Sequence, residues 1–201
     1  MKRTLLLSLI LGWAAVASAD PQVGQPAPNF MAWDIFGRRV TLNACKGKIV
    51  VLESYYKGCP FCESHYTNGA MQELQKDGPP NGVVWLLINE SSQTPAAAKK
   101  DWADRKMAVS DWIVDADYEI ARTYAMRTAP QAFVIDKNGV LAYQGAMDDL
   151  AQTHPGALPG TLDPRTARNY VRETVRALQA GEKVAVPETK PYGCGLGHIY
   201  Y

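Results

Sequence analysis

Residues 49–62 read IVVLESYYKGCPFC, and this stretch decides the fold. The predicted strand, residues 48–56, contains a continuous run of Ile, Val and Leu, which is typical of a strand buried on both faces. The motif Cys59-Pro60-Phe61-Cys62 follows this strand directly, and residues 63–76 then have the pattern of a helix, which Gly69 disfavours. This order predicts an α/β domain with both cysteines where the strand gives way to the helix.

The rest of the chain alternates between strand and helix patterns. The Asn-Gly turn at 138–139 predicts a hairpin, because this dipeptide suits the tight turns between antiparallel strands. The expected elements are a hairpin of 30–34 and 38–42, a strand at 83–88, a helix at 96–106 begun by Thr94-Pro95, a strand at 112–114, a short helix at 118–124, a hairpin of 132–135 and 140–143, and a last helix from Asp163-Pro164 to Gly181. We therefore predict one α/β domain with a central mixed sheet flanked by helices.

The composition excludes several classes of protein. Lys and Arg number 21 against 20 Asp and Glu in 201 residues, which leaves a formal charge of +1. Such a chain lacks the basic surface that neutralises phosphates, so we expect no nucleic acid as a partner. The 47% hydrophobic content is that of a folded globular protein. Four cysteines are too few for a small disulfide-rich domain that depends on its disulfides for stability.

The N-terminus has the pattern of a signal peptide. Lys and Arg follow the first Met, an uncharged and mostly apolar run spans 4–16, and the small residues 17–19 have the spacing of a cleavage site. We expect residues 1–19 to be removed and residues 20–201 to form the domain. The apolar run is short for a membrane span, so we expect no stable membrane insertion. The predicted location is a bacterial periplasm, where disulfides persist.

The position of Cys59 suits thiol chemistry. A cysteine at a helix start meets the partial positive charge of unpaired backbone N–H groups, which stabilises the thiolate and lowers the thiol pKa. Because the thiolate is the attacking species, Cys59 is the predicted nucleophile. Cys62 lies one helical turn on and can displace a mixed disulfide. The alternatives are a static disulfide or half of a zinc site.

Three features of the chain resemble the thioredoxin superfamily. Glu53 lies six residues before Cys59, where thioredoxins place a buried acid, and the resemblance implies that it takes the proton from Cys62. Pro130 ends a segment similar to the cis-proline loop of the family. Ala129 would then offer backbone pairing to a substrate chain. The turn at residues 136–139, which follows the predicted strand 132–135, also matches the hairpin turn of the family. The implied catalytic residues are Cys59, Cys62, Glu53 and Pro130.

A closer resemblance is to the alkyl hydroperoxide reductase/thiol-specific antioxidant (AhpC/TSA, redoxin) branch. Residues 23–30, VGQPAPNF, resemble its opening, and residues 190–194, KPYGC, resemble the ending of a bacterial subgroup. The resemblance implies a thioredoxin-like fold with an N-terminal β-hairpin and a C-terminal tail. Peroxiredoxins of the branch carry Pro-x-x-x-Thr/Ser-x-x-Cys, whereas Leu52 and Tyr56 occupy those positions here. This difference favours disulfide exchange over peroxidase activity.

The other two cysteines leave the disulfide pairing open. Cys45 and Cys194 could form a structural bridge, which would give an exported protein an even count of paired cysteines. Alternatively, Cys194 resolves or relays to Cys59, as the subgroup resemblance implies; in many of that subgroup the position of Cys62 is not cysteine. Spacing selects none of the three pairings. We expect Cys59 and Cys62 to form the active pair and favour Cys45–Cys194 as the structural bridge.

Aromatic side chains bracket the motif. Tyr55, Tyr56 and Phe61 could form an apolar collar that binds an extended partner chain, or they could shield the sulfurs. Both interpretations stay open, and the candidate substrate-binding residues are Ala129, Phe61 and Tyr56.

A metal site is the third interpretation. Cys59, Cys62 and His65, together with Cys194 and His198, could form a thiolate-rich zinc or copper(I) site. We expect His65 instead to be a partly exposed helix residue.

The sequence therefore predicts an exported thiol–disulfide oxidoreductase that exchanges with protein thiols and with an upstream redox partner, without a cofactor or metal. The alternatives are a peroxidase, with Cys59 oxidised and Cys62 or Cys194 resolving, and a copper or zinc carrier.

Overall fold

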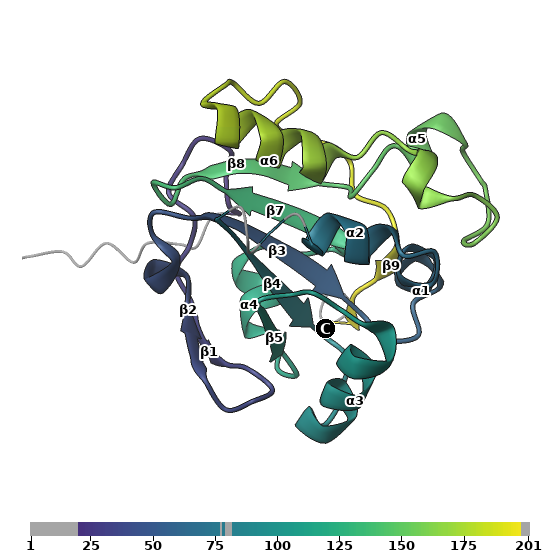
Figure 1. The fold of residues 1–201 in the computed structure, drawn as a ribbon, viewed down its shortest axis with the longest axis horizontal. Coiled ribbons are helices and arrows are strands. Elements are labelled where there is room, and N and C mark those ends of the chain that lie inside the picture. The colour runs from purple at the N-terminus through teal and green to yellow at the C-terminus, as the bar shows by residue number, and fades with distance from the viewer. Residues whose placement is uncertain (1–19, 77, 79–81, 198–201) are drawn as a thin grey trace, which may run out of the picture.

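A five-stranded mixed sheet forms the centre of the molecule, in the order β5-β4-β3-β7-β8 (Figure 1). The structure, a computed structural model, describes residues 20–76, 78 and 82–197. Strands β3, β4 and β5 run parallel, β7 runs antiparallel to its neighbour β3, and β8 runs antiparallel to β7. The strands are β3 (Ile49–Tyr55), β4 (Val83–Asn89), β5 (Asp111–Val114), β7 (Gln131–Ile135) and β8 (Leu141–Gly145). The predicted α/β domain with a mixed sheet is confirmed.

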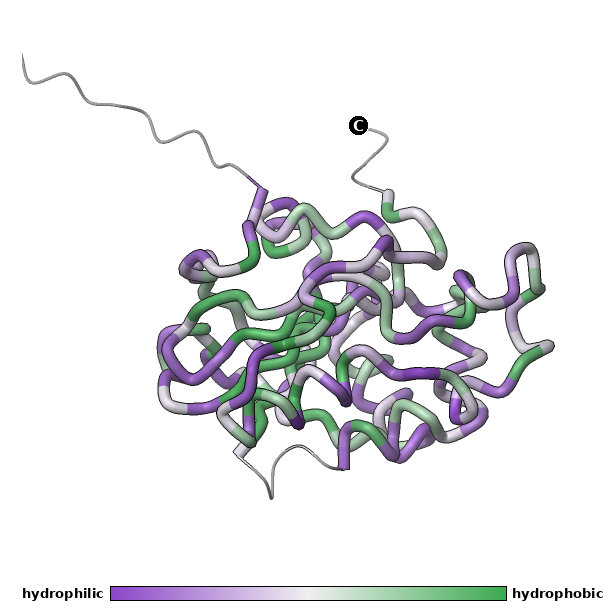
Figure 2. The backbone as a smooth tube through the Cα atoms, turned by 90° about the horizontal axis from the view of Figure 1, so that it is seen from above, coloured by the Kyte–Doolittle hydropathy of each residue, from purple (hydrophilic) through white to green (hydrophobic). Residues whose placement is uncertain are grey.

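The core lies along the central strands. All seven residues of β3 are buried, as are all five of β7. Figure 2 shows the hydrophobic segments gathered in the middle of the molecule. The uninterrupted apolar run at 49–52 is explained by this position, because a central strand covered on both faces has no side for polar residues.

The predicted N-terminal hairpin is present and shorter than expected. Its strands are β1 (Met31–Trp33) and β2 (Arg39–Thr41), followed by a 3-10 turn at Leu42–Cys45. The hairpin adjoins β5, where the Ile35 N–H donates to the Trp112 carbonyl at 2.9 Å.

The predicted helix at 63–76 is wrong in its extent, because the structure divides it. Helix α1 spans Pro60–Thr67 and α2 spans Ala70–Lys76. Gly69 separates them with a φ of +77°, a left-handed conformation that glycine adopts without steric cost. Helix α1 also begins earlier than predicted, at Pro60, because proline is favoured at the first helical position.

Of the remaining helices, α3 and α4 were predicted and α6 begins later than predicted. The bounds are α3 (Pro95–Arg105), α4 (Glu119–Thr123), α5 (Leu150–Thr153) and α6 (Tyr170–Ala180). Asp163 caps only a 3-10 turn, whereas the Asn169 side chain caps α6 by accepting from the Arg172 N–H at 2.8 Å. Gly181 ends α6 as predicted. Helix α5 was not predicted.

The C-terminal segment crosses from the sheet edge to the start of α1 (Figure 1). It first follows β8, where the Thr189 N–H donates to the Gln144 carbonyl at 3.1 Å. It then forms β9 (Cys194–Gly195), which pairs antiparallel with β6 (Thr128–Ala129). We call residues 190–196 the tail.

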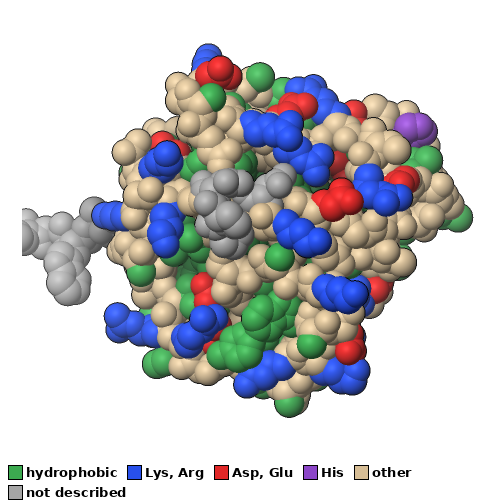
Figure 3. Space-filling model, in the orientation of Figure 1, with side chains coloured by type: hydrophobic (Ala, Val, Ile, Leu, Met, Phe, Trp, Pro, Cys, Tyr) green, Lys and Arg blue, Asp and Glu red, His purple; other side chains and the backbone are tan. Residues whose placement is uncertain are grey.

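The surface carries charges of both signs. On the face shown in Figure 3, basic side chains are dispersed among neutral and acidic ones. Within the described ranges, no helix is long and apolar enough to cross a membrane. The proposed signal peptide, 1–19, lies outside the described residues.

Candidate active site

Cys59 occupies the junction of β3 and α1 and is bonded to the tail. It is the residue that caps the N-terminus of α1, with Pro60 as the first helical residue. A disulfide joins Cys59 to Cys194 across 135 residues of sequence, with their Cα atoms 5.9 Å apart. Cys59 is buried, and its Sγ lies 3.1 Å from the Ala129 carbonyl oxygen.

The favoured Cys45–Cys194 bridge and the expected Cys59–Cys62 bond are both absent from this structure, in which Cys45 and Cys62 are free thiols. Cys45 precedes β3 and Cys59 follows it, so the two lie at opposite ends of a seven-residue strand. At about 3.3 Å per residue this strand is roughly 20 Å long, far beyond the span of a disulfide. Because Cys194 sits at the Cys59 end, Cys45 cannot reach it.

Cys62 is a buried thiol on the inner side of α1. Burial raises its pKa, and the nearby carboxyl of Glu53 raises it further, while a backbone hydrogen bond to Tyr56 opposes the increase. Cys62 therefore needs a proton acceptor before it can attack a disulfide.

Glu53 is fully buried in the middle of β3 and accepts three hydrogen bonds. Tyr66 donates to Oε1 at 2.7 Å, while Trp85 and Gln75 donate to Oε2 at 2.7 and 3.2 Å. Burial raises the pKa of Glu53 to about 7, and the three hydrogen bonds limit the increase. No lysine pairs with Glu53 among the contacts of the described residues, and the nearby Lys57 pairs with Asp101 at 3.0 Å.

The loop before β7 faces the cysteines. The peptide bond between Ala129 and Pro130 is cis. Ala129 is buried and lies opposite Cys194 in the β6–β9 pair, with Thr128 opposite Gly195. The structure thus brings Cys59, Ala129 and Pro130 together, as the thioredoxin resemblance implied.

His65 is buried, which corrects the expectation of a partly exposed residue. Its Nδ1 lies 2.8 Å from the Phe61 carbonyl and its Nε2 lies 2.7 Å from the Asp148 carboxylate. Burial lowers the pKa of His65, but Asp148 and the Phe61 carbonyl outweigh this effect and raise it overall. Both ring nitrogens face acceptors, so neither is directed at a metal shared with the cysteines. His198 lies outside the described residues.

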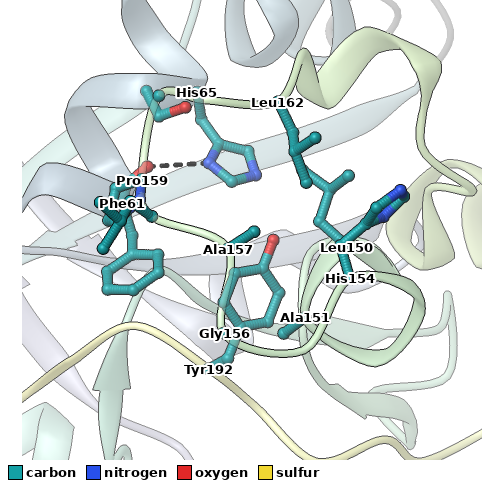
Figure 4. A pocket seen from close by; sticks show the side chains of 13 residues that line it. Phe61, His65, Leu150, Ala151, His154, Gly156, Ala157, Pro159, Leu162 and Tyr192 are labelled. Atoms are coloured by element: carbon teal, nitrogen blue, oxygen red, sulfur yellow. Dashed lines mark hydrogen bonds between the residues drawn. The ribbon is translucent and has the colours of Figure 1, made fainter.

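The same carboxylate holds the tail. Asp148 accepts a short hydrogen bond from the Tyr192 hydroxyl in addition to its contact with His65. The Tyr192 ring packs edge-on against Phe61, with centroids 5.8 Å apart. Figure 4 shows Tyr192, Phe61 and His65 around a pocket of about 220 Å³, which residues 150–162 close on the other side. Neither Asp148 nor Tyr192 was predicted as a site residue; the only signal was the position of Tyr192 two residues before Cys194.

Of the predicted collar, only Tyr56 and Phe61 are accessible from the surface. Tyr56 is exposed and Phe61 is half-buried. Tyr55 is fully buried, and its hydroxyl donates to Asp101 at 3.1 Å. Tyr55 therefore belongs to the core rather than to a docking surface.

Helix α3 clamps the motif through charged residues that the sequence did not single out. Arg105 donates to both carboxylate oxygens of Glu63 at 2.8 and 2.7 Å, and to Asp101 at 3.0 Å. Asp101 in turn pairs with Lys57, so the clamp holds residues on both sides of Cys59.

A second buried acid, Glu90, follows β4. Neither of its carboxyl oxygens has a hydrogen-bond partner among the described residues, because the neighbouring Ser54 hydroxyl donates to the Thr128 carbonyl at 2.8 Å. Burial raises the pKa of Glu90 to about 9. Glu90 was not predicted as a site residue. The sequence feature that indicates it is an acidic residue directly after a predicted buried strand.

Comparison with known proteins identifies the family of this chain. A model of the AhpC/TSA family matches residues 23–144, which include the hairpin, the cysteine motif and the cis-proline loop. The chain belongs to the AhpC/TSA family. The thiol-disulfide oxidoreductase ResA of Bacillus thuringiensis subsp. konkukian is 30% identical over 122 residues, covering 59% of this chain and 66% of that protein. The match thus spans slightly less than two thirds of that relative.

Solved structures establish the fold of this AhpC/TSA protein. An uncharacterized conserved protein from Geobacillus kaustophilus superposes with a TM-score of 0.70 at 24% identity, covering 92% of this chain and 97% of that one. The thioredoxin domain of a thiol-disulfide oxidoreductase from Bacteroides vulgatus superposes with a TM-score of 0.52 at 19% identity, covering 61% of this chain and 87% of that one. The thioredoxin-like fold predicted from the sequence is confirmed.

The family match ends at residue 144, before the elements that close the site. Asp148, Tyr192 and Cys194 all lie beyond it. In this AhpC/TSA protein, the tail and its contact with Asp148 therefore lie outside the part that the family model matches.

Proposed function

We propose that this protein is an exported thiol–disulfide oxidoreductase that exchanges with partner protein thiols through Cys59. The observation that carries the proposal is the disulfide from Cys59 to Cys194, with the free thiol of Cys62 one helical turn away. A disulfide with a second thiol beside it is the arrangement that thiol–disulfide exchange requires. The ResA relative is named for this activity. The pattern of residues 1–19 supports export.

The internal step exchanges one disulfide for another. Glu53 takes the proton of Cys62, whose thiolate attacks Cys59 Sγ. The Cys59–Cys62 bond forms, the Cys59–Cys194 bond breaks, and Cys194 leaves as a thiolate that is protonated from water. The number of disulfides is unchanged, so this step needs no external oxidant. A pKa of about 7 suits Glu53 as an acceptor near neutral pH.

The external step uses the same sulfur. A partner thiolate attacks Cys59 Sγ, forms a mixed disulfide and releases the thiolate previously bonded there. Ala129 and Pro130 would shape the docking loop, with Tyr56 and Phe61 beside it. Turnover then needs an upstream redox partner that restores the starting state of the cysteines.

The test is catalysis of insulin disulfide reduction by dithiothreitol, with a serine variant of each cysteine in the full chain. We expect Cys59→Ser to lower the rate to that of dithiothreitol alone. We expect Cys62→Ser to accumulate the mixed disulfide between Cys59 and the partner protein. Cys45→Ser is the matched control and keeps the full rate. An unchanged rate for Cys59→Ser would refute the proposal.

A second candidate function is thiol-dependent peroxidase activity. The observation that favours it is the Cys59–Cys194 disulfide itself, which is the product left when a second cysteine resolves an oxidised one. The peroxidase would oxidise reduced Cys59 with stoichiometric hydrogen peroxide far faster than it oxidises free cysteine, and would retain this rate in Cys62→Ser. A rate equal to that of free cysteine eliminates this candidate.

A further inference from the structure

The tail lies in the site as a partner polypeptide would. Its cysteine is bonded to Cys59, its backbone pairs with Ala129, and its aromatic ring packs against Phe61. An extended segment that gains main-chain pairing from a short strand and specificity from alternate side chains is a recurring mode of peptide recognition.

We propose that the groove between Phe61 and Ala129 selects partner segments with the pattern aromatic–Gly–Cys, for which the tail's Tyr192-Gly193-Cys194 is the built-in example. This inference rests on the proposed exchange at Cys59 and adds the sequence preference of that exchange. The occupant is an extended segment of a partner protein, which takes the groove when the tail leaves it.

The pairing fixes where the cysteine of the segment must lie. Cys194 is opposite Ala129 while its sulfur is bonded to Cys59. Tyr192, two residues before the cysteine, is the tail residue whose ring contacts Phe61, and Phe61 lies in the first turn of α1, whose N-cap is Cys59.

The aromatic position has two specific contacts. Phe61 meets the Tyr192 ring edge-on at an interplanar angle of 77°, a favoured arrangement of aromatic pairs. Asp148 accepts from the ring hydroxyl and is itself fully buried and held by His65. A tyrosine satisfies both contacts, a phenylalanine only the first, and an alanine neither.

The central position accepts only glycine. Gly193 has a φ of +144°, a conformation that other residues rarely adopt. A Cβ atom on Gly193 would lie 2.2 Å from the Ala129 carbonyl oxygen and 3.1 Å from the Pro130 nitrogen. Both atoms belong to the backbone of the cis-proline loop, so they cannot move aside as a flexible side chain would.

The experiment uses the full chain with Cys45, Cys62 and Cys194 changed to serine, which leaves Cys59 as its only thiol. The probes are the peptides Pro-Tyr-Gly-Cys-Gly, Pro-Ala-Gly-Cys-Gly and Pro-Tyr-Ala-Cys-Gly, each activated as a disulfide with thionitrobenzoate. The Cys59 thiolate attacks the peptide sulfur, the Cys59–peptide disulfide forms, and thionitrobenzoate leaves as the coloured thiolate. Its release gives the rate, which is divided by the rate of the same peptide with glutathione.

We expect the normalised rate of the Tyr-Gly-Cys peptide to exceed that of each of the other two peptides by about ten-fold. Changing Phe61→Ala in the same background should reduce the preference for tyrosine, because only the Asp148 contact remains, and should keep the preference for glycine. Phe36→Ala, which changes an exposed aromatic residue of the hairpin, should alter neither preference. Equal normalised rates for the three peptides would overturn this inference and leave the exchange proposal intact. Rates no faster than those of glutathione for all three peptides would instead refute the exchange proposal.

Discussion

Cys194 lies opposite Ala129 in an antiparallel pair, and its sulfur is bonded to Cys59. One tail residue therefore occupies both the backbone position beside the cis-proline and the reactive sulfur. Any partner that docks at Ala129 must displace this residue. The contacts that hold the tail consequently control access to Cys59, and several of them can be altered singly.

The first prediction concerns Gly193. Because a Cβ atom there would overlap the Ala129 carbonyl, Gly193→Ala should weaken the docking of the tail. We expect the equilibrium between the Cys59–Cys194 disulfide and dithiothreitol to shift about ten-fold or more toward the reduced protein. Quantifying the two forms by alkylation and mass analysis measures the shift.

The control for this prediction is Gly37→Ala. Gly37 also has a positive φ, of +78°, but no atom lies within 4 Å of the added Cβ. Gly37→Ala should leave the equilibrium between the Cys59–Cys194 disulfide and dithiothreitol unchanged. Equal shifts in both variants would show that general destabilisation, rather than the contact with Ala129, is responsible.

The second prediction concerns Asp148. His65 has a raised pKa in the folded protein, so its interaction with Asp148 stabilises the fold fully below about pH 6.5, the ordinary value, and less as the pH rises through the folded value. Asp148→Asn should therefore lower the free energy of unfolding most at low pH, with a difference from wild type that narrows as the pH rises. Urea unfolding at pH 5.5, 7 and 9 measures this difference, with the exposed Asp117→Asn as control.

A constant difference across this pH range would contradict the assignment of a charged pair. Below pH 6, we expect Asp148→Asn to lower the free energy of unfolding by about 3 kcal/mol, which is the scale for removing one partner of a buried ion pair.

The third prediction concerns Glu90. Its pKa rises from an ordinary 4.5 to about 9 on folding, so the folded protein keeps a proton that the unfolded chain has lost. Between these values, stability falls as the pH rises, by at most about 1.4 kcal/mol per pH unit. Glu90→Gln should flatten this dependence and raise the free energy of unfolding at pH 8. The exposed Glu182→Gln, measured by the same urea titrations, should do neither.

The fourth prediction concerns the clamp from α3. Arg105→Ala leaves Glu63 and the buried Asp101 without their guanidinium partner, and we expect a loss of about 1–3 kcal/mol in the free energy of unfolding. Because the clamp holds both sides of Cys59, alkylation of the buried Cys62 in the reduced protein should be several-fold faster. Arg122→Ala, which changes an exposed arginine of α4, is the control. If Cys62 is alkylated at the wild-type rate in Arg105→Ala, the clamp does not position the motif.

Local patterns were sufficient for much of the fold. The apolar run at 49–52 became a fully buried strand, Thr94 capped its helix, and Gly181 ended α6. These features depend on residues within a few positions of one another, which is why sequence spacing predicts them. Gly69 had a local signal too, but its effect was underestimated: it divided the helix rather than merely weakening it.

The sequence by itself also determined the chemistry available at the site, because Cys59 must stand where a buried strand meets a helix. Only the tertiary structure decided which cysteine bonds to it. Cys45, Cys62 and Cys194 are equivalent candidates by type, yet β3 separates Cys45 from Cys59, whereas the pairing of β9 with β6 brings Cys194 to it. The same is true of His65, whose burial follows from Asp148, 83 residues away. Contacts between residues so distant in the chain depend on how the elements pack, and no local pattern encodes that packing.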